Sequence, residues 1–175
     1  MSHLLVYATT ESRLHADLVI VRLKQAGISM ASISILHPQS LRPNSALCWI
    51  NGSAFLKLSS GESVAITGSL SRPLSEDVGR DESTPFAGHL GRLGLSREEA
   101  LSLEESLLEN RIVIAIEVTD EYELPAVYHT LRGLDVQKVD TADLAQRGPA
   151  DGSRSRRYRP VFAPAAFAME NYRAA

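Results

Sequence analysis

The amino-acid sequence predicts an α+β domain that is built on one antiparallel sheet. Two stretches of the 175-residue chain, residues 3–38 and 112–139, share one order of features. Each has an apolar strand, a turn with threonine and acidic residues, an amphipathic helix, a glycine and a more polar strand. Two such βαβ units side by side give a βαββαβ sandwich with its helices on one face of the sheet. We therefore expect a ferredoxin-like domain over residues 1–144, with an insertion at about residues 39–95.

The first unit begins with the apolar run His3–Ala8, which is typical of a strand that is buried on both faces. Residues 9–12 offer N-caps and an acidic first turn to a helix. We expect this helix to end at Gly27, where a left-handed C-cap fits. A half-exposed strand, Ile33–Leu36, then ends before Pro38. The apolar stripe of the helix is expected to be Leu14, Leu18, Val21 and Leu23, with Val19 and Ala26 beside it.

A longer helix leads into the second unit. It starts at a capping box, Ser96–Glu99, and Asn110 can end it. The strand Ile112–Ile116 is the most apolar and β-branched segment of the chain, so we expect it in the centre of the sheet. A shorter helix at residues 126–131 and a polar strand at 136–139 complete the unit. The apolar side of the longer helix is expected to be Ala100, Leu101, Leu103, Leu107 and Leu108.

The hydrophobic grading of the four strands predicts their places in the sheet. The first and third strands are apolar and are expected in the middle. The second and fourth are more polar and are expected at the edges, where Lys138 would deter pairing with another chain.

The insertion predicts a small meander of strands followed by a polar loop. Three short strands, Leu47–Ile50, Ala54–Leu58 and Ser63–Ile66, are separated by turn-forming residues, with Asn51-Gly52 as a hairpin signal. We expect a mobile loop over Ser69–Pro85 and one or two helical turns over Phe86–Leu93.

Charge is divided unevenly along the chain. Lys and Arg number 18 against 21 Asp and Glu, a net charge of −3. Residues 145–175 hold six arginines and two acids, so this part carries +4 and the remainder −7. We expect residues 145–175 to be a flexible basic tail, because they have no sustained hydrophobic period. Nucleic acid or a partner is expected to reach only this tail, through Arg154, Arg156, Arg157 and Arg159.

The sequence shows no catalytic constellation. The five histidines lack zinc-ligand spacing and are interpreted as surface or strand-end residues. Cys48 is the only cysteine, which excludes a disulfide scaffold and favours an inert buried thiol. The Gly88, Gly91 and Gly94 spacing has no lysine of a nucleotide loop. We expect no metal and no cofactor. A solvated acidic helix face is expected at Glu98, Glu99, Glu104, Glu105 and Glu109.

Two segments resemble a known family. Leu93–Ala100, the helix after it and Arg111–Val118 are similar to the second half of the bacterial general stress proteins with a heat-induced stress protein YflT-like domain. Tyr7–Glu11 through Lys24–Ile28 are similar to their first half. The resemblance implies a ferredoxin-like α+β domain, an association with stress and no established catalytic residues.

This chain departs from the family pattern in two places. Many relatives carry a Gly/Ala-rich apolar segment between the halves. Here only residues 66–70 and 88–91 are similar to it, so membrane contact is not expected. Inside a helix that begins at Thr119, Pro125 would clash with the carbonyl group of Glu121, so the shorter helix either begins near Pro125 or is kinked there.

The favoured function is that of a non-enzymatic, stress-associated accessory protein that acts by self-association or partner binding. A homo-oligomer could pair through the sheet edges or the open face of the sheet. The alternatives are a small-molecule-sensing regulatory domain of ACT-like type, with a polar pocket near the first β–α turn, and an enzyme of unrecognised type. We expect a cytoplasmic protein without a membrane span, since the start of the chain lacks the pattern of a signal peptide.

Overall fold

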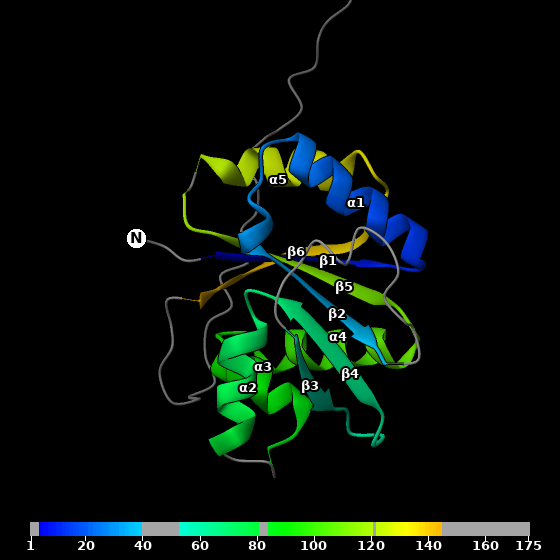
Figure 1. Cartoon of the computed structure of the whole chain (residues 1–175), viewed down its shortest axis with the longest axis vertical. Coiled ribbons are helices and arrows are strands. Elements are labelled where there is room, and N and C mark those ends of the chain that lie inside the picture. Colours follow the sequence, from blue (N-terminus) through cyan, green and yellow to red (C-terminus); the bar gives the residue numbers. More distant parts are fainter. Residues whose placement is uncertain (1–3, 40–52, 81–83, 121, 145–175) are drawn as a thin grey trace, which may run out of the picture.

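The structure is a computed structural model that combines five α-helices with one six-stranded antiparallel sheet in its described part (Figure 1). The predicted strand Leu47–Ile50, the Asn51-Gly52 turn, Cys48 and the predicted basic tail lie outside that part. The structure describes residues 4–39, 53–80, 84–120 and 122–144.

The sheet has the strand order β3-β4-β2-β5-β1-β6, and each neighbouring pair is antiparallel. The two most apolar strands, β1 and β5, pair along their whole length, from Leu4 opposite Val118 to Thr10 opposite Ile112. This confirms that both lie side by side in the sheet interior. The bounds are β1 Leu4–Thr10, β2 Ile33–Pro38, β3 Ser53–Lys57, β4 Ser63–Gly68, β5 Ile112–Val118 and β6 Gln137–Asp143.

The prediction that the second strand is a half-exposed edge is wrong. All residues of β2 are buried, because β4 pairs with its outer side and β5 with its inner side. The two predicted insertion strands within the described residues are confirmed as the hairpin β3–β4, which continues the sheet past β2. The described edges are therefore β3 and β6.

Helices cover both faces of the sheet, which corrects the expectation of helices on one face only. Figure 1 shows α1 and α5 above the sheet and α2, α3 and α4 below it. A short 3₁₀ turn, Met30–Ser32, precedes β2. The helix bounds are α1 Arg13–Gln25, α2 Ser71–Arg80, α3 Phe86–Arg92, α4 Arg97–Leu108 and α5 Glu123–Arg132.

Each face of the sheet has its own hydrophobic core, because successive side chains of a strand point to opposite faces. On β1, Val6 and Ala8 join the core under α1 and α5, whereas Leu5 and Tyr7 join the core over α2, α3 and α4. The sheet face that the sequence left open is thus buried within the chain.

The buried side of α1 differs from the prediction. Leu14 is 81 % exposed and Leu18 is 45 % exposed. At 100° per residue, these two leucines lie on the side of α1 opposite the buried stripe, whereas Val21 is partly buried and packs against the core. The helix therefore has two apolar sides, and the sheet covers only one of them. The residues that α1 buries are Ala16, Val19, Ile20 and Leu23.

The predicted mobile loop at Ser69–Pro85 is largely the helix α2. Pro73 stands in its first turn, where a missing N–H costs no helical hydrogen bond, and Leu74 is fully buried. Gly68 permits the sharp turn from the end of β4 into α2. Its φ is +100°, and a Cβ there would lie 2.1 Å from the carbonyl oxygen of Ile33. The sequence pattern failed because Pro73 and Gly79 were interpreted as breakers inside a segment whose apolar residues are few.

The predicted helix ends are confirmed. Ser96 and Glu99 form both hydrogen bonds of the capping box. Gly27 has a φ of +85°, and Asn110, with a φ of 61°, ends α4 in the same left-handed conformation. Because α5 begins at Glu123, Pro125 lies in its first turn and causes no clash, which decides between the two alternatives for this proline. The helical turns predicted at Phe86–Leu93 are α3.

Candidate functional site

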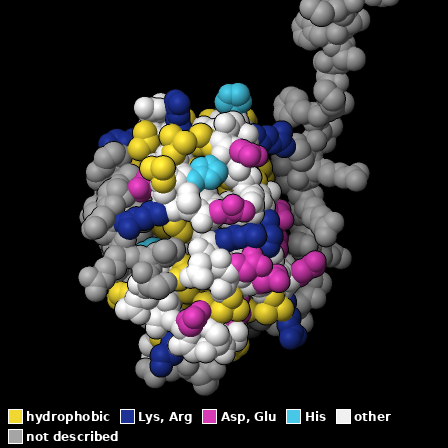
Figure 2. Space-filling model, turned by 90° about the vertical axis from the view of Figure 1, so that its right-hand side faces the viewer, with side chains coloured by type: hydrophobic (Ala, Val, Ile, Leu, Met, Phe, Trp, Pro, Cys, Tyr) yellow, Lys and Arg dark blue, Asp and Glu magenta, His cyan; other side chains and the backbone are white. Residues whose placement is uncertain are grey.

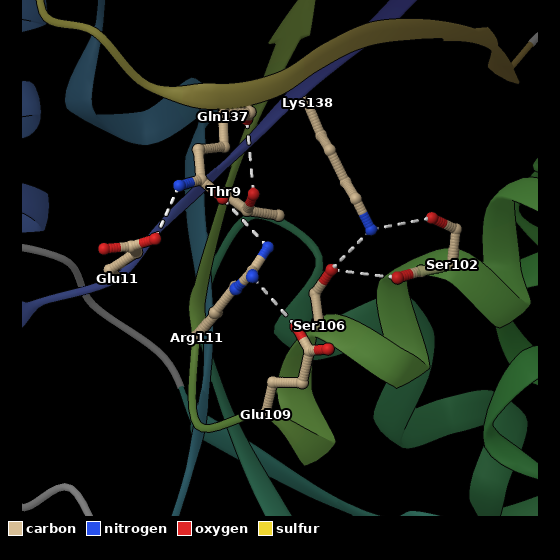
Figure 3. A network of polar contacts seen from close by, with 8 residues as sticks. All are labelled: Thr9, Glu11, Ser102, Ser106, Glu109, Arg111, Gln137 and Lys138. Carbon is tan, nitrogen blue, oxygen red and sulfur yellow. Dashed lines mark hydrogen bonds and ion pairs between the residues drawn. The ribbon is translucent and has the colours of Figure 1, made fainter.

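Polar side chains gather where β6 crosses the ends of β1 and β5 (Figure 3). The Gln137 side chain joins two strands: its Nε2 donates to Glu11 Oε1 at 2.6 Å, and its Oε1 accepts from Arg111 Nη1 at 2.9 Å. Arg111 also pairs with Glu109 at 3.0 Å. The Thr9 hydroxyl donates to the Gln137 carbonyl oxygen at 3.2 Å.

Lys138 extends this network to α4. Its φ is 48°, and the register between β1 and β6 shifts at this point, between Tyr7 and Thr9. The bulge directs the lysine side chain toward α4, as Figure 3 shows. Its Nζ donates to Ser102 Oγ at 3.2 Å and to Ser106 Oγ at 3.3 Å. Lys138 therefore fastens the edge strand to α4, a role that the sequence did not predict.

A lysine amine beside a serine hydroxyl is also the arrangement of a Ser–Lys nucleophile. Ser106, however, is fully buried, and its hydroxyl donates to the Ser102 carbonyl oxygen at 2.9 Å. This hydroxyl is satisfied within α4 and is not presented to a substrate. We interpret the network as structural.

A second polar cluster joins α2 to α3. His89 Nδ1 lies 2.6 Å from Asp77 Oδ2, and Arg92 Nη1 donates to Asp77 Oδ1 at 2.8 Å. Arg92 also donates to the Thr84 hydroxyl at 3.0 Å. Burial acts to raise the pKa of Asp77, but the hydrogen bonds and charges of His89 and Arg92 outweigh it and lower this pKa. The cluster holds the two helices together.

The histidine interpretation is wrong for His89, which is buried in α3 with only 3 % of its surface exposed. His37 is a buried strand-end residue of β2, and His129 is exposed on α5. His15, on α1, lies 2.6 Å from the Leu134 carbonyl oxygen through its Nε2. In the described ranges, His, Cys, Asp and Glu side chains nowhere gather in threes as a metal site would require.

Tyr7 is a buried phenol at the centre of the sheet. Burial raises its pKa, and the nearby Glu99, Asp140 and Tyr128 raise it further. The Tyr7 hydroxyl therefore stays protonated across the physiological pH range, and the side chain packs in the core over α4.

The first β–α turn, where a sensor pocket was expected, uses its polar groups for local contacts. The Thr10 hydroxyl donates to the Ser12 carbonyl oxygen at 3.4 Å, and Ser12 Oγ accepts from His15 N–H as the N-cap of α1. Glu11 accepts from Gln137. These groups are already engaged by the chain itself.

Two apolar surfaces remain exposed on the helices. The first is the outer side of α1, which we call the α1 stripe and which consists of Leu14 and Leu18. In Figure 2, hydrophobic side chains gather in the upper part of the face shown, where acidic and basic side chains adjoin them. Arg22 and Gln25 continue the α1 stripe toward the end of the helix and are exposed.

The second surface, which we call the α4 surface, is the outer side of α4. Leu101 and Leu108 are 48 % and 38 % exposed, and a shallow hollow of about 500 Å³ lies over them. Glu98 and Glu105 flank these leucines and, within the described part of the chain, have no ion-pair partner. The α4 surface consists of Glu98, Leu101, Ser102, Glu105 and Leu108.

The predicted acidic face of this helix is confirmed only in part. Glu104 is buried, and its Oε1 accepts from the Ser59 N–H at 2.7 Å. Glu99 belongs to the capping box and Glu109 pairs with Arg111. Only Glu98 and Glu105 face solvent without such a role: at 100° per residue they lie within about 20° of each other, whereas Glu104 lies on another side of the helix and is buried.

The remaining candidates from the sequence are not brought together by the fold. Arg154, Arg156, Arg157 and Arg159 lie outside the described residues. Gly88 and Gly91 are in α3, and Gly94, with a φ of +104°, packs against the end of β6. Close packing accounts for Gly88 and Gly94, whereas Gly91 has open space beside it, and the three glycines do not share one loop.

Among the described residues, no helix is both long enough and apolar enough to cross a membrane. No family model, curated protein or solved structure matches this chain.

Proposed function

We propose that this chain is a non-enzymatic, stress-associated accessory protein that acts by self-association, with α1 packed against α1 of a second copy. The observation that carries the proposal is the α1 stripe, in which Leu14 and Leu18 are exposed on the side of the helix that faces away from the sheet. A helix that is apolar on two opposite sides fits between two packing partners. The sheet is one partner, and a second copy supplies the other.

Three further observations support parts of this proposal. The side chains of Ser106, His89 and Asp77 form contacts that hold the fold, which favours a role without catalysis. The stress association is supported by the resemblance of residues 7–28 and 93–118 to general stress proteins. The order β2-β5-β1-β6, with every neighbour antiparallel, supports a ferredoxin-like core to which β3–β4 and α2–α4 are added.

A helical interface fits this molecule better than the pairing of strand edges. The edge strand β6 carries the exposed charged residues Lys138, Asp140 and Asp143 and a bulge, and such edges resist pairing with another strand. The sheet face is covered by α2, α3 and α4. The α1 stripe is therefore a place where a two-fold interface can bury apolar surface.

The expected strength of the interface is modest. Burying a fully exposed leucine side chain contributes about 2 kcal/mol. Leu14 and Leu18 are 81 % and 45 % exposed, so these leucines in two copies supply about 5 kcal/mol before the cost of association, which is at least about 4 kcal/mol. A millimolar dissociation constant corresponds to about 4 kcal/mol, so we expect a weak dimer that forms only at millimolar concentration or above.

Sedimentation velocity of the full chain from micromolar to millimolar concentrations tests the proposal. We expect the wild type to shift toward a dimer as the concentration rises, and Leu18→Glu to remain a monomer. The matched control is Leu101→Glu, which places the same charge at a leucine of similar exposure on the opposite layer. The proposal fails if the wild type stays monomeric throughout, or if Leu18→Glu associates as strongly as the control.

A further inference from the structure

The α4 surface combines an apolar floor with negative charge that has no ion-pair partner among the residues that the structure describes. Leu101 and Leu108 line the shallow hollow, and Glu98 and Glu105 stand beside them. Carboxylates next to exposed leucines suit a basic segment that also carries an aromatic side chain, because arginine forms forked hydrogen bonds with carboxylates while a ring covers the leucines. The Lys138 amine contacts Ser102 at one side of this surface.

The chain itself holds a segment of this chemistry. Residues 145–175 carry a net charge of +4, against −7 for the remainder. Four of the six arginines in this part lie within Arg154–Arg159, and Tyr158 stands among them. It is the densest cluster of positive charge in the sequence.

The place where the described chain ends brings this segment close to α4. Leu144 is buried in the core over α4. The carbonyl oxygen of the preceding residue, Asp143, would lie 2.6 Å from a Cβ on Gly94, two residues before the N-cap of α4. The ten residues 145–154 can span up to about 33 Å. Glu98 and Leu108 are about 15 Å apart along the helix, so the whole α4 surface is within reach.

We propose that the arginine-rich segment Arg154–Arg159 of this chain docks on the α4 surface. Its arginines pair with Glu98 and Glu105, and Tyr158 covers Leu101 and Leu108. Docking of this kind shields the apolar floor of the surface and occupies the arginines that would otherwise be available to nucleic acid. The proposal concerns the layer opposite α1 and does not depend on self-association.

A spin label on the segment tests this contact in the full chain. The label is attached through Ser155→Cys in a Cys48→Ser background, at a concentration at which the chain sediments as a monomer. We expect the amide signals of residues 98–108 to be attenuated several-fold more than those of residues 13–25. Attenuation that is equal over α4 and α1, as expected if the arginines serve only nucleic acid, would overturn the proposal.

Charge exchange makes the test specific. The double variant Glu98→Lys, Glu105→Lys is expected to remove the selective attenuation at α4, and Arg→Glu at positions 154, 156, 157 and 159 in that variant is expected to restore it. Glu62→Lys, at an exposed acid in the β3–β4 turn, is the control and should leave the attenuation unchanged. Selective attenuation that persists in the double variant would show that these carboxylates do not hold the segment.

Discussion

The two helical layers of this protein are held to the same sheet by different means. The core under α1 and α5 is rich in isoleucine and valine, which β5 and β2 supply. The core over α2, α3 and α4 is rich in leucine, and polar contacts accompany it: Asp77 with His89, Glu104 with the Ser59 N–H, and Lys138 with two serines. The first layer therefore depends on packing alone to a greater degree, whereas the second also depends on charge.

The difference follows from where the layers lie in the sequence. The helices α1 and α5 each sit within a βαβ unit and pack on the strands next to them in the chain. The helices α2 and α3 come from the insertion, so they must be joined to one another and to α4 by contacts between side chains. The pair of His89 with Asp77 supplies such a contact between α2 and α3. Polar contacts of fixed geometry specify one arrangement where hydrophobic burial alone permits several.

The largest effect on stability is expected from a change in the core under α1 and α5. Ile114 is fully buried on β5 and faces α1. Ile114→Ala should lower the free energy of unfolding by about 3 kcal/mol, because it removes apolar contacts and leaves a cavity. Urea denaturation at pH 5 and at pH 7 provides the measurement, and we expect the same loss at both values. A loss that changes markedly with pH would contradict the assignment of this layer to packing.

A smaller, pH-dependent effect is expected from the second layer. Asp77→Asn removes a charged hydrogen-bond partner of His89 and Arg92 and should cost about 2 kcal/mol at neutral pH. Because the folded state lowers the pKa of Asp77, its contribution is fully present above the pKa of the unfolded chain, about 3.9. The contribution is then lost as the pH falls through the folded pKa.

The measurement is urea denaturation of wild type and Asp77→Asn as the pH is lowered from 7. The two stability curves should approach each other in acid. Glu62→Gln, at an exposed acid, is the control and should run parallel to the wild type. A constant separation between wild type and Asp77→Asn would show that the cost is steric and not electrostatic.

The sequence predicted the parts of the fold that depend on local pattern. The apolar strands β1 and β5, the capping box at Ser96 and the helix end at Gly27 follow from neighbouring residues, and the structure has them as expected. The inserted hairpin was also predicted for its two described strands. Each of these features is encoded within a few residues, so one sequence is enough to read it.

The parts that failed depend on partners distant in the chain. In α1 both sides are apolar, so periodicity could not show that Ile20 faces the sheet and Leu18 faces solvent. The strand β2 is polar at Ser34, but Ser34 Oγ accepts from the Leu70 N–H and contacts Ser69, which allows it to be buried. The polar network around Gln137 and Lys138 was not predicted for the same reason, because its members are distant from one another in the chain. Nothing near Lys138 in the sequence indicates that its bulge carries it to Ser102.

The smallest expected effect compares the two N-caps. The Ser12 side chain caps α1 by accepting one hydrogen bond, from the His15 N–H. The Ser96 side chain caps α4 by accepting from the Glu99 N–H, and the Ser96 N–H also donates to the Glu99 carboxylate. Each serine-to-alanine change should cost about 1 kcal/mol. Ser96→Ala is expected to cost more than Ser12→Ala. Without the serine hydroxyl, the hydrogen bond between the Ser96 N–H and the Glu99 carboxylate is also expected to weaken. Thermal unfolding of both variants is the measurement. Equal shifts in Tm would mean that the bond between the residue 96 N–H and Glu99 persists without the serine side chain. A larger shift for Ser12→Ala would show that the layer of α1 and α5 depends more on its N-cap than the layer of α2, α3 and α4 does.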